Sequence, residues 1–274
     1  MSRLSLPLAP PRRMGETLRR DAWWVQPLVV FVILGSFVIY ATWAALQNGY
    51  YTSGPYLSPF YSPVLWADAT DTKGLEHAWI GPKPTWWPGW LPFSPALIIL
   101  PFPAFFRFTC YYYRGAYYKA FWSDPPSCAV GEWRSSYLGE KTMPLILQNI
   151  HRYFFYAAVI FIFILAYDAY LAFWFTDAAG EKHFGIGVGT IILVANVYLL
   201  GGYTFGCHSF RHLVGGRFDL LSKHPTRKKL YDCASCLNEA HMRWAWASLL
   251  VVAFADIYVR CCAMGIWHDL HWEF

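Results

Sequence analysis

Charged side chains are scarce in this sequence. Only 14% of its 274 residues are Asp, Glu, Lys or Arg, whereas 56% are apolar; soluble domains usually carry about 25% charged residues. A soluble core of this size has no room for so much apolar surface, so the composition excludes an ordinary soluble domain. The aromatic share of 20% is typical of a chain whose helices cross two headgroup layers.

Three further features are missing. The first apolar run lacks a small-residue cleavage site and is too long for a signal peptide, so we expect it to be a retained anchor. The basic residues form no single stripe, so the net charge of +5 does not indicate a nucleic-acid partner. No internal repeat is present.

Five apolar stretches are long enough to cross a hydrocarbon core, which takes about 20 helical residues. They lie near residues 24–47, 90–113, 145–176, 184–214 and 237–262. The sequence therefore predicts an all-α fold, an integral membrane bundle of five transmembrane helices over residues 24–262. Pro95, Pro101 and Pro103 predict that the second helix is kinked or partly unwound.

Lys and Arg are distributed unevenly between the two ends of these helices. Five lie in the tail 1–23, four in the 114–143 loop and five in the 215–236 loop, against four on the opposite side. The positive-inside rule then predicts a multi-pass protein of the cell membrane with a cytoplasmic N-terminus and a periplasmic C-terminal tail, 263–274. Segment 48–89, rich in Pro, Gly and aromatic residues, is expected to be an outer loop lying over the bundle.

Cysteine and histidine residues concentrate near the cytoplasmic ends of the predicted helices. The predicted boundaries place them one to two turns inside, in a slab about 6–12 Å deep at about 1.5 Å per residue. They are Cys110, His151, Cys207, His208, His212 and His241. Helices two to five can each supply one ligand to a common site, which is one way to build a metal site in a bundle core.

The ligand types narrow the choice of metal. A His/Cys mixture suits zinc or an iron–sulfur cluster, and in a Rieske-type 2Fe–2S centre two His replace two Cys on one iron. A structural zinc has little to stabilise in a bilayer, where helices satisfy their own backbones. A b haem between two His is the alternative. Because no helix carries a His in its outer half, a two-haem path across the membrane is not expected.

Several residues also have simpler interpretations. A lone cysteine in a membrane helix is usually a small core residue. The CxxC of Cys233 and Cys236 could hold zinc or a cluster, but without a second pair it is weak evidence for either. Asp168 and Asp256 lie toward the outer half. We interpret them as structural partners of Arg260, with a proton path as the alternative.

Four separated motifs resemble one known family. They are Cys110-Tyr-Tyr-Tyr-Arg114 with Pro125-Pro126-Ser-Cys128, then Gln148-Asn149-Ile-His151-Arg152, Cys207-His208-Ser209-Phe-Arg211-His212, and His241-Met-Arg-Trp244. Over about residues 20–262 the sequence resembles the membrane anchor (cytochrome b-like) subunit of the actinobacterial type F succinate dehydrogenases, or respiratory complex II. That class carries a membrane-embedded Rieske-type cluster.

The resemblance implies a subunit of a succinate:quinone oxidoreductase whose succinate site is on another chain. A flavoprotein subunit with FAD oxidises succinate, and a soluble iron–sulfur subunit passes electrons to the anchor, where menaquinone or ubiquinone is reduced. Nothing in the sequence resembles a flavin-binding fold or the soluble clusters' motifs. The flavoprotein and iron–sulfur parts are therefore expected to be other chains. The cytoplasmic loops 114–143 and 215–236 are their expected docking surface, and the heterotrimer is expected to form a higher oligomer.

The depth and one-per-helix arguments assign the ligands of the implied cluster. The first choice is Cys110 and Cys207 on one iron with His151 and His241 on the other; Cys128, His208 and His212 are the second choice. Quinone reduction needs two protons and donors to the carbonyl oxygens. The candidates at that depth are Arg152, His208, Ser209, Arg211, His212 and Trp244.

Two alternative functions stay open. One is a complex II anchor that holds a single b haem. The other is a transporter without a redox centre, which would need a substrate path lined by broken helices. The kinked second helix is the feature that favours it.

Overall fold

The structure is a computed structural model that describes residues 13–134, 142–143, 145–177, 179–216 and 219–274. Residues 1–12 of the predicted tail lie outside the described residues, as do Lys141 and Arg217 of the two basic loops. By internal contacts the chain forms two units. The first comprises Met1–Val38 and Phe108–Asn149, and the second comprises Ile39–Arg107 and Ile150–Phe274.

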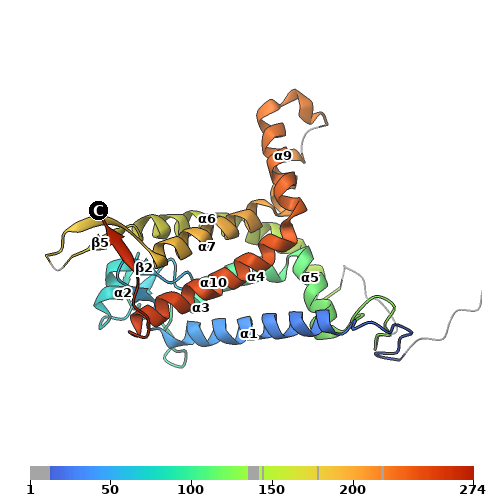
Figure 1. Ribbon diagram of the computed structural model, residues 1–274, viewed down its shortest axis with the longest axis horizontal. Coiled ribbons are helices and arrows are strands. Elements are labelled where there is room, and N and C mark those ends of the chain that lie inside the picture. The colour runs from blue at the N-terminus through green and yellow to red at the C-terminus, as the bar shows by residue number, and fades with distance from the viewer. Residues whose placement is uncertain (1–12, 135–141, 144, 178, 217–218) are drawn as a thin grey trace, which may run out of the picture. The chain divides into compact units, whose positions relative to one another are not determined.

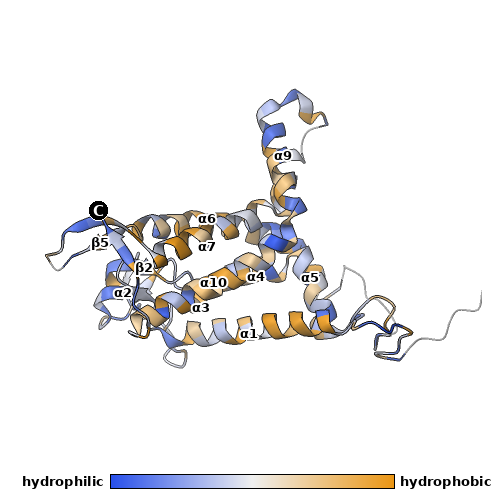
Figure 2. Ribbon diagram, in the orientation of Figure 1, coloured by the Kyte–Doolittle hydropathy of each residue, from blue (hydrophilic) through white to orange (hydrophobic). Residues whose placement is uncertain are grey.

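The architecture is mostly helical, as the sequence predicts. Within the described residues, four helical segments are long and apolar enough to cross a membrane, and their helices are α1 (Val25–Gln47), α6 (His151–Leu171), α7 (Val188–Phe205) and α10 (His241–Ala263). The broken pair Ala96–Phe108 and Tyr111–Trp122 makes a fifth span if it is counted as one. Figure 2 shows that the long helices are predominantly hydrophobic.

In the second unit, α6, α7 and α10 pack side by side, with α7 in contact with both neighbours (Figure 1). Their outward faces carry large apolar side chains, and Phe163, Ile191 and Leu250 are each more than half exposed. Such surface suits lipid, because association between membrane helices depends on packing and not on burying apolar area from water.

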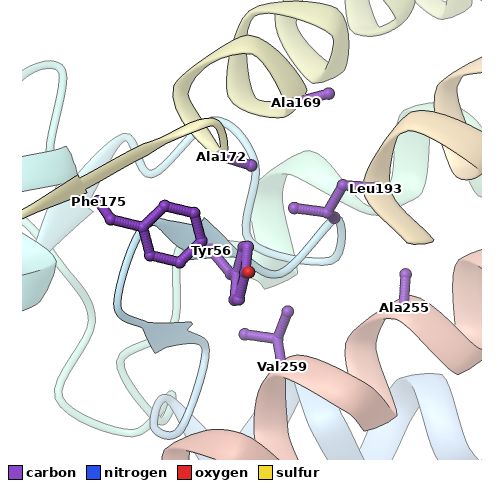
Figure 3. Close-up of a cluster of buried hydrophobic side chains, with 7 residues drawn as sticks. All are labelled: Tyr56, Ala169, Ala172, Phe175, Leu193, Ala255 and Val259. Atoms are coloured by element: carbon purple, nitrogen blue, oxygen red, sulfur yellow. The ribbon is translucent and has the colours of Figure 1, made fainter. Parts of the chain in front are cut away.

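Small side chains let these helices approach closely around a buried cluster (Figure 3). It consists of Tyr56, Ala169, Ala172, Phe175, Leu193, Ala255 and Val259. Tyr56 comes from the segment between α1 and α3 (Ala96–Ile99), so this segment supplies part of the bundle core. Burial and a hydrogen bond to Asp269 raise the pKa of Tyr56, so its hydroxyl keeps its proton and donates to Asp269 at 2.6 Å.

The same segment bonds to two buried carboxylates of the bundle. The Asp256 carboxylate accepts from the hydroxyls of Ser58 and Tyr40 and lies 3.3 Å from Nε of Arg260. The predicted pairing of Asp256 with Arg260 is therefore confirmed. Asp168 instead accepts a hydrogen bond from Ser62. It therefore pairs with the segment between α1 and α3, and the predicted pairing with Arg260 is formed by Asp256.

Short strands, which the sequence analysis did not predict, lie in the connections between helices. β5 (Trp174–Thr176), β6 (Lys182–Gly187) and β7 (His271–Glu273) form a three-stranded antiparallel sheet with β6 in the centre. Two smaller strand pairs lie in the loop after α1, and the short helix α2 (Thr72–His77) lies between the strands of the second pair in the sequence. The pairs are β1 (Thr52–Ser53) with β2 (Tyr56–Leu57), and β3 (Trp66–Ala67) with β4 (Gly81–Pro82).

The predicted helix boundaries were too wide in three places. Residues 174–176 and 184–187 are strands. The predicted helix 184–214 is α7 followed by a break at Gly206 and Cys207 and then α8 (His208–Gly215). Before α10 a separate helix, α9 (Pro225–Glu239), projects from the bundle (Figure 1). Pro225 at its first turn explains its start, because proline lacks the N–H that an interior helical position requires.

The predicted second helix is broken, as its prolines indicate. It consists of α3 and α4 (Pro101–Phe108), and α5 (Tyr111–Tyr117) follows as a separate helix in the first unit. α5 continues as the π-helical turn η1 (Tyr118–Trp122).

The first unit joins the residues before α1 to the loop after η1. Gly15 and Glu16 exchange backbone hydrogen bonds with Gly131 at 2.9 Å each. Arg19 donates to Ser127 Oγ and to the carbonyl of Cys128, also at 2.9 Å. These contacts order the loop that carries Cys128.

Candidate functional site

Two predicted ligands are in direct contact in the second unit. His151 Nε2 lies 3.1 Å from Cys207 Sγ, within hydrogen-bonding distance. His151 is the first residue of α6, and Cys207 immediately precedes α8. Two residues that the sequence assigns to one site therefore lie in contact. His151 follows the 3-10 helix Leu145–Ile150 and so lies inside the helical segment Ile146–Leu171, whereas Cys207 lies at a break between helices.

The break before α8 positions Cys207. A Cβ on Gly206 would lie 2.6 Å from the carbonyl oxygen of Gly202, so only glycine fits this close turn. The Gly206 carbonyl accepts a hydrogen bond from Asn238 Nδ2 at 2.8 Å. Cys207 is extended, with φ −71° and ψ 143°, and 2% exposed.

Aromatic rings connect His151 to a second predicted ligand, His241. Phe106 stacks on the His151 imidazole, with centroids 4.8 Å apart and planes 6° apart. Phe106 also meets Tyr203 edge to face at 5.3 Å, and Tyr203 stacks on His241 at 5.0 Å. His241 is the first residue of α10, so three helix starts bring their ligand-type side chains to one aromatic cluster.

Arg107 completes this cluster. Its guanidinium lies over the Tyr203 ring, with Cζ 4.7 Å from the centroid. Nη1 donates to the Ala245 carbonyl at 3.1 Å and Nη2 to Ser248 Oγ at 2.9 Å. Sequence reasoning missed Phe106 and Tyr203, which look like many other aromatic residues of this chain. Arg107 had a usable signal, because an arginine inside an apolar membrane segment is a functional candidate by default.

The other two predicted cysteines belong to the first unit. Cys110 is 3% exposed and caps the start of α5 in an extended conformation. Cys128 is exposed. Across the described ranges, no three His, Cys, Asp or Glu side chains form a group that could hold a metal ion. The four-ligand set of Cys110, His151, Cys207 and His241 therefore stays a prediction.

The remaining histidines line a separate cavity of about 290 Å³ between α8 and α9. His208 and His212 have ring centroids 4.3 Å apart. Arg211 donates from Nη2 to the Tyr231 hydroxyl at 2.8 Å. This cavity offers several donors to a ligand oxygen.

The last three quinone candidates are dispersed. Arg152 is exposed on α6, and Ser209 is half-buried on α8. Trp244 packs on α7, since a Cβ on Gly202 would lie 2.6 Å from its Cε3. Its buried Nε1 has no hydrogen-bond partner among the residues that the structure describes. An indole N–H in that position can donate to a ligand carbonyl.

A multi-pass helical bundle with histidine and cysteine in contact where its helices begin defines a membrane protein with a polar site at one end of its bundle. The chain belongs to the family of the actinobacterial succinate dehydrogenase subunit SdhC, whose family model matches residues 25–265. It is similar to a chain of the Mycobacterium smegmatis Sdh1 complex in the apo form, with 43% identity and a TM-score of 0.81. The match covers 95% of this chain and 96% of that chain. No curated protein matches.

The family membership establishes the kind of protein. This chain is a membrane subunit of a succinate dehydrogenase complex, a succinate:quinone oxidoreductase, and its partners are the other subunits of that complex.

Proposed function

We propose that this subunit relays electrons from the soluble iron–sulfur subunit to menaquinone through a Rieske-type 2Fe–2S cluster. Cys110, His151, Cys207 and His241 would hold the cluster. The contact of His151 with Cys207 at 3.1 Å carries the proposal, because it places an imidazole and a thiol, the two ligand types of such a centre, together inside the bundle. When bound, the cluster supplies one-electron transfer at a potential above those of ordinary all-cysteine clusters.

The surrounding residues prepare these ligands. Stacking on Phe106 fixes the plane of the His151 ring, and the break before α8 fixes the position of Cys207. The neighbouring Phe106 and Tyr203 are 3% and 1% exposed, so the rings that contact the two half-buried imidazoles are held in place by packing. A preorganised set of ligands is what a redox centre requires.

Two groups are candidates to bind and protonate the quinone. The Trp244 indole N–H is buried and can donate to a quinone carbonyl. His208 and His212, beside Arg211 in the α8–α9 cavity, can donate protons from their imidazoles, while Arg152 and Ser209 are weaker candidates because they lie apart from both groups. Ubiquinone would use the same donors.

We further propose that a flavoprotein subunit with FAD and an iron–sulfur subunit dock on the cytoplasmic side. α9 supports this assignment because it is a polar helix that leaves the apolar bundle (Figure 2). It carries Arg227, Lys228 and Lys229 in its first turns, and basic residues favour the cytoplasmic side. The N-terminus would then be cytoplasmic and the C-terminus periplasmic.

The test is EPR spectroscopy of the purified complex, comparing wild type with a His151→Ala, His241→Ala double variant. We expect loss of the membrane cluster signal and of quinone reduction, while succinate oxidation by an artificial acceptor is retained. His268→Ala, at an exposed position after α10, is the control and should behave as wild type. Full quinone reduction by the double variant would contradict the proposal. Sharp visible bands on reduction would indicate a b haem instead.

A further inference from the structure

Arg107 introduces a permanent positive charge into an apolar membrane segment. A guanidinium cannot be deprotonated in a protein, so placing it there costs free energy that a neutral residue would not. The groups that it contacts are among the most buried of the unit: Ala245 and Ser248 are 0% exposed and Tyr203 is 1% exposed. The position of this charge is therefore fixed by buried structure.

The guanidinium is held on two sides. Two of its hydrogen bonds reach α10 at Ala245 and Ser248, one and two turns beyond His241. Its face lies on the Tyr203 ring of α7, a cation–π contact. Arg107 therefore ties α4 to both helices that frame the His241 side chain.

The Tyr203 ring contacts both the Arg107 guanidinium and the His241 imidazole. The imidazole stacks on it with planes 20° apart. A ring held by the guanidinium restrains the imidazole that packs against it. Partners of this kind orient metal ligands and tune the metal centre that the ligands hold.

We propose that Arg107 is a positioning residue that, through Tyr203, fixes the His241 imidazole and raises the reduction potential of the redox centre. This inference rests on the proposed function. A fixed positive charge stabilises the state that carries one more electron, and it does so more strongly in the low dielectric of a bilayer than in water. Removing the charge lowers the potential, and removing the stack frees the imidazole.

The experiment is an EPR-monitored redox titration of the intact complex. In Arg107→Gln we expect the midpoint potential to fall by about 59 mV or more, which is tenfold in a one-electron equilibrium constant. Arg107→Lys keeps the charge but loses the planar fork. Its potential should stay closer to wild type while its EPR line shape changes.

Tyr203→Leu removes the stack and keeps Arg107, so it tests the same route if Arg107→Gln does not assemble. It should alter the EPR line shape, whereas Tyr203→Phe, which keeps the ring, should not. An unchanged potential in Arg107→Gln, or an unchanged spectrum in Tyr203→Leu, would overturn the inference alone. A wild-type complex without a Rieske-type signal would overturn both the proposed function and this inference.

Discussion

At Gly202 the lack of a side chain sets how closely α7 and α10 approach. An added Cβ would lie 2.6 and 2.7 Å from two ring carbons of Trp244. We expect Gly202→Ala to destabilise the complex by about 1–3 kcal/mol, the usual cost of overpacking, and to lower quinone reduction by displacing the indole. The measurement is the thermal midpoint of the purified complex together with its quinone reductase rate.

The neighbouring glycine provides the matched control for that prediction. A Cβ on Gly201 meets nothing within 4 Å, so Gly201→Ala should leave the thermal midpoint unchanged or slightly raised. If both variants melt alike, the close approach of Gly202 and Trp244 does not limit stability.

The chemical type of the site residues could be predicted from sequence, but their surroundings could not. His151 and Cys207 were chosen because imidazole and thiol are rare in apolar helices and bind metals. Phe106 and Tyr203 have no such distinction in a chain that is 20% aromatic. Only the fold shows which rings stack on the histidines.

The element that most affects the site is the break between α7 and α8. Gly206→Ala would force its Cβ to within 2.6 Å of the Gly202 carbonyl and 3.1 Å of the Leu237 carbonyl, so the backbone before Cys207 must shift. Because Cys207 is a proposed ligand of the membrane cluster, we expect the EPR signal of that cluster to be lost or strongly broadened. The EPR signals of the soluble clusters should be unaffected. A normal signal in this variant would show that the break does not position Cys207.

The membrane-crossing helices were predictable because each contains a long apolar run, and the interruption between α3 and α4 because of the prolines there. The break at Gly206 was not, because its geometry depends on Asn238, 32 residues later in the chain. Strand β6 was also missed. Its apolar residues resemble a continuation of α7, and hydropathy does not distinguish a strand edge from a helix end.

For the whole molecule, the testable expectation is its orientation. The excess of Lys and Arg in the tail and in the two basic loops predicts that α9 faces the cytoplasm and the C-terminal tail the periplasm. We expect His268→Cys to react with a membrane-impermeant maleimide in intact cells. Lys223→Cys should gain label over the parent chain only after permeabilisation. The reverse pattern would invert the proposed topology and the side of partner docking.

The hydrogen bonds of the loop after α1 have a consequence for biogenesis. Ser58 bonds to Asp256 across 198 residues and Ser62 to Asp168 across 106. During synthesis the hydrogen bond from Ser58 cannot form until α10, which carries Asp256, has been inserted. The loop therefore completes its contacts with the bundle last. Nascent chains arrested before α10 should thus keep this loop open to proteases that the finished subunit resists.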